Sequence, residues 1–170
     1  MPPRDTATAP IVLTPIATPT RVPRRLPIAG GARSAIVVYR GPSAIDGSPI
    51  VAILSGLVEP SDNSKTGPMA QLWILPADVA PHEAQRTGED RSVCGACPMR
   101  PSIAPKGSPR CYVKTFQGPL STWKANHAEP VDLAGAVAAL RGKALRLGAY
   151  GDPAAIPERS GVVQIGRAHV

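Results

Sequence analysis

The chain has 170 residues, a formal net charge of +7, three cysteines and only 4% aromatic residues. This length suits one domain, and the scarcity of aromatic side chains requires a core of Ile, Val, Leu and Ala. The longest apolar stretch, Ile50 to Val58, is far too short to span a bilayer, and three cysteines do not suit a secreted disulfide framework.

The first 34 residues carry seven prolines, and five arginines against one aspartate. This composition is typical of a disordered or polyproline-like arm. No apolar signal-peptide core follows Met1, so we expect a cytoplasmic monomer, without a membrane partner, in a reducing environment where thiols stay free. The excess positive charge permits contact with nucleic acid, although a solvated basic surface explains it equally well.

From residue 35 to about Gln164 the pattern predicts an α/β domain. β-branched runs bounded by turn residues indicate strands, and proline, aspartate and glycine mark helix ends. The predicted strands cover 35–39, 50–54, 71–75 and 144–150, and the predicted helices cover 119–127 and a segment from Asp132 to Gly142. The first two strands should form a hairpin. The order of strand, cysteine segment, helix and strand predicts a βαβ unit with a parallel sheet.

The three cysteines all lie in one eighteen-residue window of a segment, 76–112, that we predict to be a long loop. Cys94 and Cys97 have the C-x-x-C spacing that is the commonest chelating unit for zinc or an iron–sulfur cluster, and Cys111 supplies a third thiol. Neighbouring cations such as Arg100 are expected to lower the thiol pKa values and favour metal ligation. A bound metal would also offset the entropy cost of ordering so long a loop.

The identity of the metal stays open at this stage. A structural zinc ion needs a fourth ligand, and the candidate histidines, His82 and His127, do not fall at a standard zinc-finger spacing. A 4Fe–4S cluster held by three thiolates keeps one iron open and needs no histidine. The zinc alternative describes a non-enzymatic module that is stapled by metal and associates with nucleic acid through its basic surface.

Two further motifs are candidate ligand-binding sites. Asp152 directly follows Gly151 after the predicted strand 144–150, at the carboxyl end where ligands bind in parallel α/β folds. Its carboxylate can accept hydrogen bonds from an amino or hydroxyl group, although an Asp-Pro turn leaving the strand is the simpler interpretation. Lys65 lies in a polar turn and can meet an anion, but the glycine spacing there is not that of a phosphate-binding P-loop.

Five short motifs occur in a specific order over about ninety residues. They are Asn63 to Gly67, Cys94 to Pro98, Cys111-Tyr112, Gln117-Gly118-Pro119 and Arg146 to Pro153. This ordered set resembles a three-cysteine family of phage and plasmid proteins, which in turn is similar to divergent radical S-adenosylmethionine enzymes. The cysteine spacing departs from their usual C-x-x-x-C-x-x-C, and Gly-Asp-Pro stands where they have Gly-Gly-Glu.

The resemblance implies a partial (β/α) barrel whose activity would be radical chemistry on a substrate that the sequence does not name. It implies that Cys94, Cys97 and Cys111 ligate a 4Fe–4S cluster. It also implies that Gly151 and Asp152 lie beside the amino group of S-adenosylmethionine.

The last six residues, 165–170, match a widely used sequencing adapter translated in frame. We therefore expect them to be artefactual, and we expect the natural domain to continue beyond about Gln164. His169 is accordingly not considered a metal ligand. A barrel truncated in this way is expected to be inactive even where its parent is an enzyme.

Overall fold

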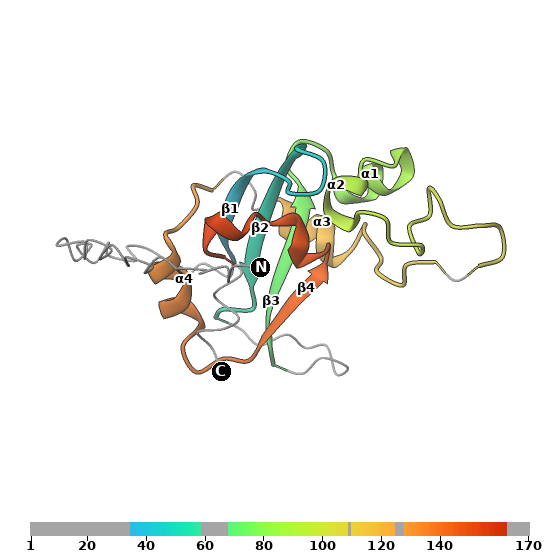
Figure 1. The fold of residues 1–170 in the computed structure, drawn as a ribbon. Helices are drawn as coiled ribbons and strands as arrows, with labels where there is room; N and C mark the ends of the chain where they lie inside the picture. Colours follow the sequence, from blue (N-terminus) through green and yellow to red (C-terminus); the bar gives the residue numbers. More distant parts are fainter. Residues whose placement is uncertain (1–34, 59–67, 109, 125–127, 163–170) are drawn as a thin grey trace, which may run out of the picture. The chain divides into compact units, whose positions relative to one another are not determined.

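The computed structural model describes residues 35–58, 68–108, 110–124 and 128–162, all within the unit Ala32–Val170. They form a mixed α/β fold with an open sheet and short helices (Figure 1). The strands are β1 (Ala35–Pro42), β2 (Pro49–Ser55), β3 (Ala70–Pro76) and β4 (Leu145–Tyr150). The helices are α1 (Pro81–Thr87), α2 (Arg91–Cys94), α3 (Gly118–Trp123) and α4 (Leu133–Leu140), with 3-10 turns η1 (Pro153–Ala155) and η2 (Glu158–Ser160). The predicted arm, 1–34, and the suspected adapter residues, 165–170, lie outside the described residues.

The sheet of the described residues has the strand order β1-β2-β3-β4. β1 pairs with β2 and β2 with β3 in antiparallel fashion, whereas β3 and β4 are parallel. The predicted hairpin is therefore confirmed, but the prediction of a parallel sheet holds only for β3 and β4. A parallel pair needs a crossover of a dozen or more residues, and the chain between β3 and β4 supplies one that contains α1 to α4.

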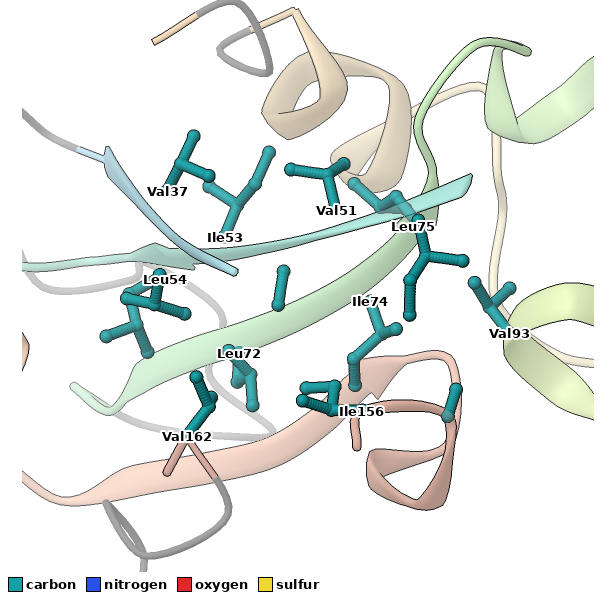
Figure 2. Packing of buried hydrophobic residues seen from close by; sticks show 14 of the residues in the cluster. Val37, Val51, Ile53, Leu54, Leu72, Ile74, Leu75, Val93, Ile156 and Val162 are labelled. Carbon is teal, nitrogen blue, oxygen red and sulfur yellow. The ribbon is translucent and has the colours of Figure 1, made fainter. Parts of the chain in front are cut away.

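The core is aliphatic, as the composition requires. The residues Ile50–Leu54 of β2 are fully buried, since this central strand is covered on both faces. Figure 2 shows Ile53 on one face of β2 and Leu54 on the other. Ile156 and Val162, from the chain after β4, cover the face on which Leu54 lies.

The opposite face of β3 is covered by α3. Gly118 lies so close to the Trp73 ring that a Cβ at this position would come within 3.0 Å of it. The Trp123 Nε1 donates a hydrogen bond to the Pro76 carbonyl oxygen at 2.8 Å. The predicted helix with Pro119 in its first turn is thus confirmed, although it ends at Trp123, and residues 125–127 lie outside the described ranges.

The prediction for α4 is confirmed by its N-cap, where the Asp132 Oδ1 accepts a hydrogen bond from the Gly135 backbone at 2.6 Å. The prediction of an uninterrupted loop over 76–112 was wrong, because this segment contains α1 and α2. α1 has a proline in its first turn and ends at Gly88, whose φ of 91° is left-handed. None of the helices in the described ranges is long and apolar enough to cross a membrane.

Candidate metal centre

The cysteine segment begins at the carboxyl ends of the parallel strands. α2 ends at Cys94 and packs against β3 and η1 (Figure 1). The backbone N–H of Asp152, two residues beyond β4, donates to the Val93 carbonyl oxygen at 2.6 Å. The first cysteine and the predicted Gly151-Asp152 site are therefore neighbours, as expected for motifs at the carboxyl ends of adjacent parallel strands.

The three cysteines are free and differ in exposure. Cys94 and Cys111 are half-buried, whereas Cys97 is exposed. A turn links the first two, with the Cys97 N–H donating to the Cys94 carbonyl oxygen at 3.1 Å. The Cys111 N–H donates to the Met99 carbonyl oxygen at 2.8 Å, which holds the third cysteine against the residues that follow the C-x-x-C turn.

A buried ion pair braces this turn. The Arg100 side chain donates from Nε and Nη2 to the Asp90 Oδ1 at 2.9 and 2.6 Å, and both side chains are almost fully buried. The same guanidinium donates to the Gly88 carbonyl oxygen at 2.7 Å and to the Gly95 carbonyl oxygen at 3.0 Å. Arg100 therefore fixes the chain on both sides of Cys94, and no pattern in the sequence identified this pairing.

The electrostatics of Cys94 are opposite to the sequence-based expectation. The pKa of the Cys94 thiol is raised from 9.0 to about 12, mainly by burial and additionally by the neighbouring Asp90, Cys111 and Cys97. The expected lowering by cations is not found: Arg100 is paired with the buried Asp90, whose own charge raises the pKa of the Cys94 thiol. In the metal-free protein Cys94 is a protonated thiol, and a metal ion must displace its proton.

Tyr150, the last residue of β4, is the second polar group beside Cys94. Burial also raises the pKa of the Tyr150 hydroxyl, and the charges of Cys94 and Asp90 act in the same direction. The hydroxyl interacts weakly with the Cys94 sulfur and slightly opposes the increase in the thiol pKa. Among the described residues no atom meets the full geometry of a hydrogen bond to this buried hydroxyl. Tyr150 therefore faces the candidate centre with unused hydrogen-bonding capacity.

Of the three residues that were predicted to contact a cofactor, the structure describes two, and these differ in their structural environment. Gly151 has a φ of 81°, and a Cβ there would clash with the Ile74 carbonyl oxygen and come within 2.8 Å of the Ile74 Cβ. Asp152 is exposed, and its Oδ1 accepts from the Ala154 N–H at 2.9 Å, so one oxygen caps η1. Lys65 lies outside the described residues.

The candidate zinc ligands do not complete the centre. His82 is exposed on α1, and His127 lies outside the described ranges. Within the part of the chain that the structure describes, no three or more His, Cys, Asp or Glu side chains are already grouped for metal binding. The three thiols are neighbours, but they do not form a closed ligand set.

The loop between β1 and β2 supports the centre from a distant part of the sequence. The Ser43 hydroxyl donates to the Ser92 carbonyl oxygen in α2 at 2.6 Å, and the Ala44 N–H donates to the Ala155 carbonyl oxygen at 2.8 Å. Ile45 packs where a Cβ at Gly95 would lie. The contacts of this loop could not be predicted from the sequence, because nothing local in it signals partners that are distant along the chain.

Comparison of the chain with family models, curated proteins and solved structures found no match.

Proposed function

We propose that Cys94, Cys97 and Cys111 bind an iron–sulfur cluster of the 4Fe–4S type in a protein related to radical S-adenosylmethionine enzymes. The observation that carries the proposal is the proximity of the C-x-x-C turn to the exit of β4, joined by the hydrogen bond from Asp152 to Val93. Three thiol donors at the carboxyl ends of parallel strands suit a cluster with one open iron. The β3–β4 unit would then correspond to part of a (β/α) barrel.

Three cysteine thiols are suitable ligands for such a cluster, but their sulfur atoms must come together before they can bind it. Cys94 is fixed by α2, and Cys111 is held by its backbone hydrogen bond to Met99. Cys97 is exposed in a turn and can move without breaking buried contacts. Metal binding would therefore mainly reorient Cys97 and Cys111, and its free energy would stabilise the segment.

Each neighbouring residue has a separate role in this proposal. Gly151 lets the turn after β4 lie directly against Ile74 of β3, and Asp152 keeps one carboxylate oxygen for an amino group while the other caps η1. Tyr150 offers a buried hydroxyl to the sulfur of Cys94. Lys65 is a further proposed contact for the anionic end of the cofactor. When bound, a cluster with an open iron supplies one-electron reduction of S-adenosylmethionine.

A zinc-stapled module is the second candidate, because the chain from Arg91 to Ala128 is rich in cations and lacks carboxylates. From Arg91 to Ala128 the sequence has six Lys and Arg residues and no Asp or Glu. Such a segment suits a non-enzymatic protein that associates with a polyanion. The two candidates differ in the metal and in the response to S-adenosylmethionine.

The decisive test is metal and sulfide analysis with a visible spectrum on protein purified without oxygen. We expect about four iron and four sulfide per chain with charge-transfer absorbance, and loss of both in Cys94→Ala, Cys97→Ala and Cys111→Ala. Ser121→Ala, an exposed change on α3, is the control and should retain the iron. A colourless protein with one zinc would contradict the cluster and support the zinc candidate, and iron retained in the Cys111→Ala variant would exclude Cys111 as a cluster ligand.

Binding of S-adenosylmethionine is tested separately by titration of the iron-loaded protein. Asp152→Asn keeps an oxygen that can cap η1 but removes the negative charge, so we expect at least a tenfold loss of affinity. Asp46→Asn, at an exposed turn in the β1–β2 loop, is the matched control and should bind normally. Equal affinity of the two variants would remove Asp152 from the site without affecting the cluster.

A further inference from the structure

The segment that carries Cys111 presents an unusual row of exposed side chains. Arg110, Tyr112, Lys114 and Phe116 are exposed and alternate with inward-facing Cys111, Val113 and Thr115. Tyr112 is 77% exposed and Phe116 is 61% exposed, which is unusual for aromatic residues in a chain that has so few. We call these four exposed residues the basic–aromatic strip.

The strip is anchored from its inner side. Thr115 is buried, and its hydroxyl donates to the Gln85 Oε1 of α1 at 3.0 Å. Val113 packs against the aliphatic core, and Cys111 is held by the Met99 carbonyl oxygen. The outward direction of the alternate residues is therefore a consequence of the fold and does not depend on a loosely attached loop.

The charges of the strip are unpaired. Neither Arg110 nor Lys114 forms an ion pair with any described residue. Arg146, on β4, donates from Nη2 to the Tyr112 hydroxyl at 2.9 Å, which orients the ring and adds a third cation. The chain from Arg91 to Ala128, which includes the strip, has no carboxylate in its sequence, and this favours an anionic partner.

We propose that the basic–aromatic strip binds single-stranded nucleic acid, with bases stacked on Tyr112 and Phe116 and phosphates at Arg110 and Lys114. Exposed aromatic rings between unpaired cations are the combination that single-strand-binding surfaces use. A folded acidic protein would make use of the cations but would not require two exposed rings. A duplex keeps its bases stacked, and the strip lies in irregular chain rather than on a helix that could enter the major groove. This inference holds whichever metal the cysteines bind.

The test is fluorescence anisotropy of a labelled oligothymidylate with the full chain, repeated over a range of salt concentrations. Tyr112→Ala and Phe116→Ala should each weaken binding about tenfold. Arg110→Gln combined with Lys114→Gln should lower the slope of log affinity against log salt by about 1.4 units. The matched charge control is Arg40→Gln with Arg159→Gln, two exposed positions on β1 and η2, which should leave affinity within about twofold.

All variants, including the charge control, keep the arginines of residues 1–34. Any contribution of these arginines to nucleic-acid affinity is therefore the same in every variant. Circular dichroism and metal content should be unchanged in the aromatic variants, so loss of binding is not loss of the metal centre. Oligothymidylate binding that is unaffected by the two aromatic changes at every salt concentration would overturn the proposal. Equal competition by heparin in the wild type and in the aromatic variants would also overturn it, because a surface for any polyanion needs no rings.

Discussion

The sheet and the cysteine segment, residues 88–117, are stabilised in different ways. In the sheet, Val37, Val51, Ile53 and Leu54 have no exposed surface, and the stabilisation is spread over many aliphatic contacts. In the cysteine segment a single side chain, Arg100, makes four hydrogen bonds that hold the C-x-x-C turn. The sheet therefore tolerates the loss of one contact, whereas the segment depends on one guanidinium and, in our proposal, on a metal.

This difference also explains why the side chains that can contact a ligand lie in the cysteine segment and not in the sheet. Most apolar side chains of β2 and β3 are enclosed, but Met99, Ile103, Tyr112 and Phe116 of the cysteine segment are exposed. A segment held by directional polar contacts keeps side chains free for ligands, because it does not need to bury them for stability.

The largest effect is expected from Arg100→Met. It leaves Asp90 as a buried charge without a partner, so the free energy of unfolding should fall by about 4 kcal/mol. Arg91→Met, an exposed change in α2, is the matched control and should cost about 0.5 kcal/mol or less. The measurement is urea unfolding of the metal-free protein.

A double variant separates the lost charge from the lost packing. Asp90→Leu combined with Arg100→Met removes both buried charges and should recover part of the stability. If Arg100→Met unfolds at the same urea concentration as Arg91→Met, the ion pair does not stabilise the segment, and the contrast with the sheet fails.

The next effect concerns the sheet itself. Ile53→Ala creates a cavity in the centre of β2 and should lower the free energy of unfolding by about 3 kcal/mol, while Ile53→Val should cost about 1 kcal/mol. Metal content of the folded Ile53→Ala protein should equal that of the wild type, because the centre is braced by Arg100 and the β1–β2 loop. Loss of metal from folded Ile53→Ala would show that the two regions are not separable.

Much of the sheet could be predicted from the sequence because its signals are local. β-branched runs between turn residues located β1, β2 and β3, and the Asp132 cap located α4. The same kind of signal was available for α1 in Pro81 and Gly88, but the proline-rich composition around it favoured a loop. The β3–β4 pairing followed from the predicted order of strand, cysteine segment, helix and strand.

The sequence was sufficient to locate the candidate metal centre but not to predict its hydrogen bonds or its electrostatics. The cysteine spacing indicated the three proposed donors, and the strand order predicted that Asp152 lies near Cys94. The Arg100–Asp90 pair could not be predicted, because the sequence presents Arg100 only as one of several cations in a long segment. For the same reason the pKa of Cys94 was expected to fall, and it rises. The exposure of Tyr112 and Phe116 also depends on a tertiary arrangement that anchors their neighbours instead.

The smallest effect is the pH dependence of the metal-free protein. The pKa of the Cys94 thiol is raised to about 12 in the folded state from 9.0, mainly by burial. The folded state therefore holds this proton more tightly than the unfolded state. Its contribution to stability is fully present below pH 9.0 and is lost as the pH rises towards about 12.

The measurement is the free energy of unfolding of the chelated protein against pH. Between pH 9.0 and about pH 10 the wild type should lose about 1 kcal/mol more than Cys94→Ala. Tyr150 shifts in the same direction, so Tyr150→Phe separates its part of the alkaline loss. Identical pH profiles for the wild type and Cys94→Ala would mean that the thiol is solvated and that α2 does not enclose it. A thiol that is enclosed gives up its proton only to a metal or to strong base, and metal affinity should therefore increase with pH over the same range.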